Sequence, residues 1–139
     1  MVRTAGEISN LIEKLHKDVD SEIRIEAAQE LGLSHKSWDI ESQRAIIPLI
    51  EILNDEDYEI REVAAWALGY LSRRFESNKA IEPLKNVLEE DEDSHVRVAA
   101  LSALWKIQPE DIHQLITEAA VDQDENVRKL ALTKLRRLK

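Results

Sequence analysis

Apolar residues recur at every third or fourth position along most of this chain, which is the spacing of one face of an α-helix. Thr4 and Glu7 form the Thr-x-x-Glu pattern that caps a helix start, so we expect a first helix from about Thr4 to Lys17. The same spacing predicts seven more helices, over residues 20–32, 42–53, 57–71, 78–89, 94–107, 109–121 and 124–138. Short acidic turns join these segments two by two. The pattern therefore predicts eight helices in four hairpins.

Glycine and proline refine the expected helix ends. Gly32 follows the apolar stretch of the second helix and fits a helix C-terminus. Pro109 suits the first position of a helix, where its missing amide costs nothing. Pro48 and Pro83 fall inside predicted helices, so we expect each of them near a first turn or at a bend.

The helix that begins at Asp57 has a pattern that occurs four times in the chain. Its capping aspartate has counterparts that stand 37, 36 and 31 residues apart along the sequence. Four columns hold the same residue type in every copy: Asp20, Asp57, Asp93 and Asp124; Arg24, Arg61, Arg97 and Arg128; Ala27, Ala64, Ala100 and Ala131; and Leu31, Leu68, Leu104 and Leu135. Helical pairs repeating at this period are typical of a solenoid, in which each pair buries its apolar face only against its neighbours.

The repeated form D-x-D-x-x-[IV]-R-x-x-A-[AL]-x-x-L resembles the HEAT-like repeats of the phycobilisome-lyase type. Two repeats also carry A-I-x-P-L before it, at Ala45 and Ala80. The first repeat lacks this segment and the fourth has Ile112-His113-Gln114-Leu115 in its place, as is common in terminal repeats. The resemblance extends over roughly Ile8 to the C-terminus.

The resemblance implies an all-α fold, a right-handed α-α superhelix of about four helical hairpins and eight helices. It also implies that the second helices line a concave surface and that the Asp and Arg columns form a ladder of polar contacts along the turns. No linker divides the sequence, so we expect a single domain over residues 1–139. Its repeats are expected at roughly 4–33, 40–72, 77–107 and 109–139.

Composition and charge narrow the functions of this solenoid. The 139 residues include no cysteine, which excludes disulfides and thiolate chemistry. No apolar run reaches the roughly 20 residues that span a bilayer, so we expect no membrane segment and a cytoplasmic protein. The net charge of −9 makes general nucleic-acid binding unfavourable. The charge is uneven, because residues 125–139 hold six Lys or Arg and one acid.

No combination of residues indicates an enzyme. The Asp and Arg columns recur in every repeat, whereas a catalytic site is normally unique, so we interpret them as helix caps and structural pairs. The acidic turns at 54–59 and 89–93 lack the glycine and the terminal glutamate of a calcium loop. The four histidines also lack metal-ligand spacing: His16, His35, His95 and His113. We therefore expect no catalytic, cofactor or metal site.

Residues that differ between repeats are the better guide to a binding site. The second helix of each hairpin is expected to expose a stripe at four-residue spacing that starts just after the capping aspartate. Across the four repeats this stripe comprises Ser21, Ile25, Gln29 and Leu33; Tyr58, Glu62, Trp66 and Tyr70; Ser94, Val98, Ser102 and Lys106; and Glu125, Lys129, Thr133 and Arg137. The predicted concave face therefore changes from apolar, through aromatic, to basic.

Trp66, with Tyr58 and Tyr70, is the best candidate for an interface hot spot, since Tyr, Trp and Arg dominate interface energies. The predicted partner-binding residues are Tyr58, Glu62, Trp66, Tyr70, Ile25, Gln29, Val98, Ser102, Lys106 and Arg137. The alternative is that Trp66 and Tyr70 lie between repeats as packing residues. Trp105 is expected to pack between the third and fourth hairpins. Trp38, in the longest connection, fits a convex anchor and a lid on the first hairpin equally well.

Three functions remain compatible with the sequence. The first is a non-enzymatic protein-protein interaction scaffold, which binds an unknown protein or peptide segment, acidic toward the C-terminal end, on the concave face. The second follows from the resemblance: a subunit or accessory factor of a bilin (phycobilisome) lyase-type complex. The third is nucleic-acid binding through the basic last helix, although basic residues also suit the carbonyl end of a helix. Self-association through the open ends of the solenoid is a further option.

Overall fold

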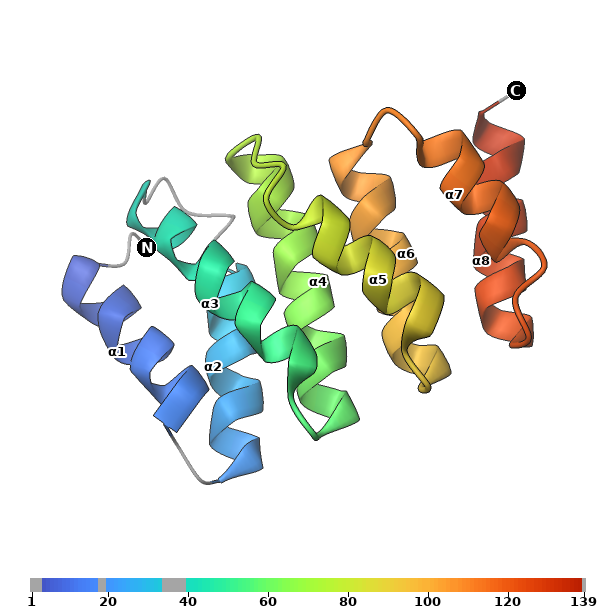
Figure 1. Ribbon diagram of the computed structural model, residues 1–139. Helices are drawn as coiled ribbons and strands as arrows, with labels where there is room; N and C mark the ends of the chain where they lie inside the picture. The colour runs from blue at the N-terminus through green and yellow to red at the C-terminus, as the bar shows by residue number, and fades with distance from the viewer. Residues whose placement is uncertain (1–3, 18–19, 34–39, 139) are drawn as a thin grey trace.

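The computed structural model describes residues 4–17, 20–33 and 40–138 and shows an α-helical solenoid (Figure 1). Its α-helices are α1 (Ala5–Lys17), α2 (Ser21–Leu33), α3 (Ile46–Glu51), α4 (Tyr58–Arg74), α5 (Ile81–Glu90), α6 (Ser94–Ile107), α7 (Ile112–Ala119) and α8 (Glu125–Arg137). The described ranges contain these eight α-helices in four successive hairpins and no strand, which confirms the predicted all-α solenoid.

The first helices of the hairpins form one layer and the second helices form the other (Figure 1). Each second helix packs on its own first helix and on the next second helix, so α2 contacts α4, α4 contacts α6, and α6 contacts α8. The core lies between the two layers. Seven residues of the predicted Ala and Leu columns are almost completely buried in it: Ala27, Ala64, Ala100, Ala131, Leu31, Leu68 and Leu104.

The predicted helix over 42–53 is not a single α-helix. This segment consists of a 3₁₀ helix at Ile40–Ala45, the short α3, and a second 3₁₀ helix at Ile52–Asn54. Pro48, in the first turn of α3, has no N–H to donate to the carbonyl of Arg44 four residues earlier, so a regular α-helix does not extend through this point. Pro83 lies in the first turn of α5, as expected.

Pro109 lies three residues before α7 and not at the first position of a helix, so that prediction is wrong. Gln108 ends α6 with a φ of 58°, in the left-handed region. The Pro109 carbonyl then accepts a hydrogen bond from the N–H of Ile112 at 3.1 Å, and this turn delays the helix start. A similar turn delays α5, where the Asn78 carbonyl accepts from the N–H of Ile81 at 3.2 Å.

Gly32 and Gly69 serve helix packing and do not end helices. Both lie within their helices, α2 and α4, and neither has a positive φ. A Cβ added at Gly32 would lie 2.6 Å from Cζ3 of Trp66 and 2.9 Å from Cβ of Ala67, and one at Gly69 would lie 2.8 Å from Cα of Ala103. Gly32 lies one residue before the last residue of α2, close to the predicted helix end, but it does not have the left-handed conformation of a glycine cap. Gly32 and Gly69 occupy equivalent positions in their repeats, and the absence of a side chain there lets the backbones of successive second helices approach each other.

Gly69→Ala is expected to lower the free energy of unfolding by about 1 to 3 kcal/mol, the usual cost of overpacking. The new methyl group meets the backbone of Ala103, so α4 and α6 have to move apart. Gly6→Ala in α1 is the matched control, because a Cβ there meets only Thr4 Oγ1 at 3.9 Å, and it should add about 0.5 kcal/mol through helix propensity. Urea denaturation followed by circular dichroism measures both. A stabilising Gly69→Ala would contradict the close approach.

The two aspartates of the Asp-x-Asp turns at 55–57, 91–93 and 122–124 have different partners. The second one caps its own helix: an Asp57 carboxylate oxygen accepts from the N–H of Glu59 at 2.9 Å. The first one pairs with the arginine of the preceding hairpin: Asp91 binds Arg61, with Nε to Oδ2 at 2.9 Å and Nη2 to Oδ1 at 3.2 Å. Equivalent pairs join Arg97 to Asp122 at 3.1 Å and Arg24 to Asp55 at 3.7 Å.

The predicted polar ladder therefore exists, but the carboxylate that pairs across repeats is not the capping one. The column of Asp20, Asp57, Asp93 and Asp124 was expected both to cap the helices and to pair with the arginines. The first aspartate contacts both the preceding hairpin and its own turn, because Asp91 Oδ1 accepts from Arg61 Nη2 at 3.2 Å and from the N–H of Asp93 at 3.0 Å. The second aspartate, Asp93, accepts from the first N–H groups of its own helix. The Arg61 Nη1 also donates to the carbonyls of Asp55 and Glu56, at 2.9 and 3.1 Å, and so ties the turn to its own helix.

Candidate binding groove on the second helices

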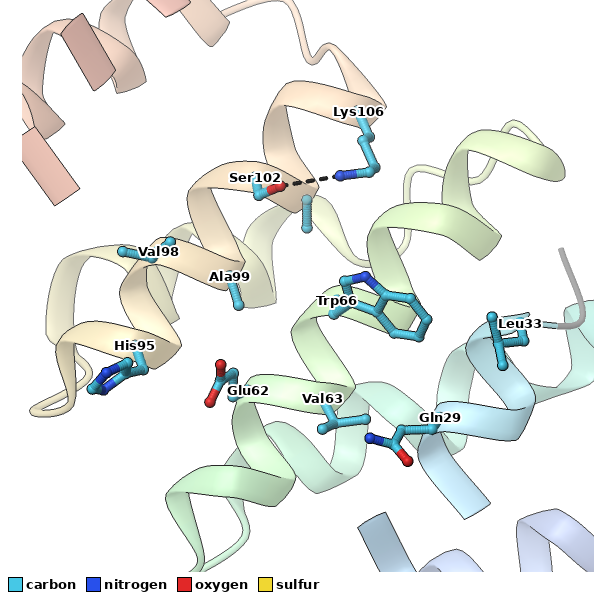
Figure 2. A pocket seen from close by; sticks show the side chains of 11 residues that line it. Gln29, Leu33, Glu62, Val63, Trp66, His95, Val98, Ala99, Ser102 and Lys106 are labelled. Atoms are coloured by element: carbon cyan, nitrogen blue, oxygen red, sulfur yellow. Dashed lines mark hydrogen bonds between the residues drawn. The ribbon is translucent and has the colours of Figure 1, made fainter. Parts of the chain in front are cut away.

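A hollow of about 530 Å³ lies on the layer of second helices and spans α2, α4 and α6 (Figure 2). We call it the α4–α6 groove. Its lining residues are Gln29, Leu33, Glu62, Val63, Trp66, His95, Val98, Ala99, Ser102, Ala103 and Lys106.

The groove has an apolar floor and polar ends. Val63 and Trp66 of α4 face Ala99 of α6 across the middle of it (Figure 2). Toward the N-terminal ends of these helices lie the side chains of Glu62 and His95. Toward the C-terminal end of α6 lie Ser102 and Lys106. A ligand lying along the helices therefore meets an acid at one end, apolar side chains in the middle and a cation at the other end.

Six of the ten predicted partner-binding residues line this groove: Gln29, Glu62, Trp66, Val98, Ser102 and Lys106. The other four do not. Tyr58 is exposed at the start of α4, with its ring centroid 6.5 Å from that of His95. Ile25 is half-buried against the core, Tyr70 is half-buried behind Trp66, and Arg137 is exposed in the last turn of α8.

Leu33 also lines the groove; it belongs to the predicted stripe but not to the predicted partner-binding residues. Four further lining residues lie outside the stripe: Val63, His95, Ala99 and Ala103. Each of them directly follows a residue of the predicted stripe in the sequence. A helix presents a face wider than one line of side chains at four-residue spacing, so the adjacent column also reaches the groove. Including that column from the start would have found all four.

Trp66 packs between repeats and also lines the groove, so the two interpretations of it are not exclusive. Its ring occupies the space that Gly32 leaves open and meets the Tyr70 ring edge-on, with centroids 4.9 Å apart. Trp105 is half-buried and contacts Lys134 of α8, as expected for a residue between the third and fourth hairpins. Trp38 lies outside the described residues.

The two ends of the second helices differ in electrostatic potential. Near the N-terminal ends, the pKa of Tyr58 is raised, first by the charge of Glu59 and then by desolvation and other carboxylates. Near the C-terminal ends, the pKa of Lys106 is lowered, first by burial and then by the charges of Lys134 and Arg73. The sequence predicted a change of character from repeat to repeat. The structure adds a second gradient, from acidic to basic, along the helix axes.

Four cations gather at the C-terminal ends of α4, α6 and α8, and we call them the basic edge: Arg73, Lys106, Lys134 and Arg137. The Lys106 Nζ donates to Ser102 Oγ at 3.0 Å and lies 4.8 Å from the centroid of the Tyr70 ring. The Lys134 Nζ lies 5.2 Å from the Trp105 ring. Within the described ranges, none of the four pairs with a carboxylate. The basic edge therefore has positive charge available for an acidic ligand.

The Lys106 ammonium is expected to titrate below the usual lysine pKa of about 10.4. Burial and the neighbouring cations both disfavour its charged form. Because the folded pKa lies below the unfolded one, the folded state releases this proton first, and stability should rise with pH between the two pKa values. An NMR titration of the lysine Nζ signals measures the shift. A Lys106 pKa at or above about 10.4 would contradict the crowding of cations at this edge.

A match to a family model agrees with the repeat pattern, the hairpins and the polar ladder. Residues 8–105 and 81–139 match the model described as HEAT repeats. The chain belongs to the HEAT-repeat family. The match identifies HEAT repeats in general, and the phycobilisome-lyase subtype stays a prediction. No curated protein matches this HEAT-repeat chain.

The acidic turns of these HEAT repeats use their carboxylates for helix caps and arginine pairs. Among residues 4–17, 20–33 and 40–138, no three His, Asp or Glu side chains converge as metal ligands do. Across the same ranges, no helix has the length and apolar character needed to span a bilayer.

Proposed function

We propose that this HEAT-repeat chain is a non-enzymatic scaffold that binds a protein segment in the α4–α6 groove. HEAT repeats are commonly protein-interaction scaffolds and are generally non-enzymatic, which supports the class of function. One observation carries the more specific proposal: an apolar floor that includes a tryptophan leads directly to the unpaired cations of the basic edge. The segment places an apolar side chain on the floor and a carboxylate at the edge.

Preorganisation favours Trp66 as the hot spot of this groove. The neighbouring Gly32 and Tyr70 already hold its ring, so binding does not have to restrict the side chain further. Opposite it, Val98 and Ala99 have small side chains that leave space for an apolar residue of the partner. A volume of about 530 Å³ falls in the range of ordinary ligand pockets.

The specificity of the groove for an acidic residue comes from Lys106. This ammonium is partly desolvated and is repelled by Lys134 and Arg73. A carboxylate placed among these cations removes the repulsion and gains a charge-assisted hydrogen bond. At the other end, Glu62 repels acids, so the segment binds in one direction, with its acidic residue toward the C-terminal end of α6.

Selection from a display library of random peptides on the folded protein tests this proposal. The expected result is enrichment of peptides in which an apolar residue is followed within a few positions by Asp or Glu. Binding of the enriched peptides should weaken with added salt, because the cations lie at the surface. Failure to enrich any peptide, or enrichment of peptides without acidic residues, would contradict the proposal.

The bilin-lyase and nucleic-acid functions stay predictions of the sequence. A salt titration with a generic DNA duplex tests the latter: an affinity that rises steeply at low salt would support it. The acidic N-terminal ends of the second helices, with Glu59 and Glu62, lie on the same helix layer as the basic edge and oppose a phosphate backbone.

A further inference from the structure

Arg128 in α8 is oriented like the arginines that pair with the following repeat. In Arg61 and Arg97, Nη1 binds turn carbonyls, while Nε and Nη2 bind the next carboxylate. The Arg128 Nη1 binds the carbonyls of Asp122 and Gln123, each at 2.8 Å. In the part of the chain that the structure describes, the remaining edge of its guanidinium meets no carboxylate. The Arg128 side chain is half-buried and is already oriented so that Nε and Nη2 could donate to a carboxylate.

Two more residues on the same face of α8 stand in columns that internal repeats use as junctions. Leu132 is 47% exposed, although its counterpart Leu101 is fully buried. Arg136 occupies the column of Gly32 and Gly69, through which a second helix meets its successor. We call the surface of Arg128, Leu132 and Arg136 the tail face. It combines an exposed apolar residue with two cations.

The first hairpin has a hollow of about 290 Å³ on its opposite side, between α1 and α2. We call it the head face; its lining residues are Leu11, Lys14, Ile23, Glu26, Ala27, Gln29, Glu30 and Leu33. Gln29 and Glu30 stand in the columns of Trp66 and Ala67, the residues that meet Gly32 at an internal junction. The head face is therefore the counterpart of a junction that the preceding helix would fill.

We propose that the tail face of one copy of this chain docks on the head face of a second copy, so that the solenoid continues head to tail. Leu132 covers the apolar part of the hollow, and Arg136 approaches Glu26 and Glu30 as Trp105, which stands in the same column, approaches Lys134 of α8 inside the chain. The charges are complementary, because residues 125–139 hold six cations and one acid, whereas α2 holds three glutamates and one arginine. Arg128 adds a second cation to the tail side of this contact.

This contact is heterologous, because the two copies use different faces. Each copy keeps one free head and one free tail, so the assembly grows with concentration and does not stop at a dimer unless a ring closes. The head face shares Gln29 and Leu33 with the edge of the α4–α6 groove, but Glu26, Glu30 and Arg136 do not line the groove. Charge changes at these three positions therefore test self-association without replacing a residue of the groove, and Lys106→Glu tests the groove without replacing a residue of the head or tail face.

Light scattering coupled to size-exclusion chromatography, over a concentration series at low salt, measures the assembly. The mean mass of the wild type should rise with concentration and return to that of the monomer at high salt. The tail variant Arg136→Glu and the head variant Glu26→Lys/Glu30→Lys should each weaken association about tenfold or more. Lys79→Glu is the matched control, since Lys79 is exposed in the turn before α5, away from both faces, and it should associate like the wild type.

Mixing the two variants decides between specific docking and general charge effects. In the mixture, the acidic tail of the Arg136→Glu variant meets the basic head of the other variant, whose own tail keeps its arginine and meets a glutamate head. The mixture should therefore associate although neither variant does alone. Circular dichroism confirms that each variant is folded. The proposal is overturned if the wild type is monomeric at all concentrations at low salt, if either variant associates like the wild type, or if the mixture stays monomeric.

Discussion

Arg61→Ala is expected to lower the free energy of unfolding by about 3 kcal/mol, whereas Arg128→Ala is expected to cost only about 1 kcal/mol. Both arginines bind the carbonyls of their own turn, so that contribution is common to the two variants. Only Arg61 also binds a carboxylate of the next repeat. The Arg61 and Asp91 side chains are just 11% and 8% exposed, so removing the cation leaves a nearly buried charge unpaired.

The difference between the two variants isolates the contact between repeats. Urea denaturation followed by far-UV circular dichroism measures the loss in free energy of unfolding for each variant. The protein concentration is kept low enough for the chain to be monomeric. A double variant, Arg61→Ala/Asp91→Ala, should cost less than the sum of the two single changes, because the pair acts as one unit. Equal costs for Arg61→Ala and Arg128→Ala would show that the arginine column stabilises each turn locally and does not join the repeats.

Lys106→Glu is expected to weaken binding of an acidic peptide selected on the wild type by about 10- to 100-fold. The change reverses the charge that faces the peptide carboxylate. It also places an acid beside Lys134 and Arg73, which relieves the repulsion at the basic edge, so the fold should not lose stability. Lower affinity with equal or higher stability is the combination that a purely structural role for Lys106 does not produce.

Val98→Glu provides an independent test of the apolar floor. Val98 is half-buried in the groove, and a carboxylate there both removes an apolar contact and repels an acidic ligand. Its affinity for the same peptide should fall at least about tenfold. Lys79→Glu, with the same charge change as Lys106→Glu, should bind like the wild type. Isothermal titration calorimetry measures all of these affinities, and unchanged binding by Lys106→Glu and Val98→Glu would exclude the groove.

Apolar periodicity was sufficient to predict the helices that carry the repeat motif. In α2, α4, α6 and α8 the capping aspartate and the buried Ala and Leu columns agree on where each helix begins and which face it buries. The weakest predictions concern the first helices near proline. The residues around Pro48 and Pro109 resemble the start of a helix in sequence. The residue at which α3 or α7 actually begins depends on the turn before it, which the sequence pattern does not predict.

The sequence predicted the centre of the groove and two cations of its basic edge, Lys106 and Arg137, but not the place of Arg73 and Lys134 beside them. Trp66, Val98 and Lys106 belong to the predicted stripe and line the groove. Equivalent positions face the same side because each second helix has the same orientation in its hairpin. Contacts between stripes depend on how closely the helices approach. Gly32 and Gly69 set that distance, yet in the sequence alone Gly32 appeared to be a helix terminus. The gathering of cations from three different helices follows only from this packing.

Mapping a bound peptide by NMR shows whether the α4–α6 groove is the binding surface. An acidic peptide selected on the wild type is titrated into ¹⁵N-labelled protein while the backbone amides and the Trp66 indole N–H are followed. Binding in the groove should give shifts that saturate together at Val63, Trp66, Val98 and Lys106. Shifts confined to the first helices α1, α3, α5 and α7, or saturating changes that leave the Trp66 indole unaffected, would contradict it.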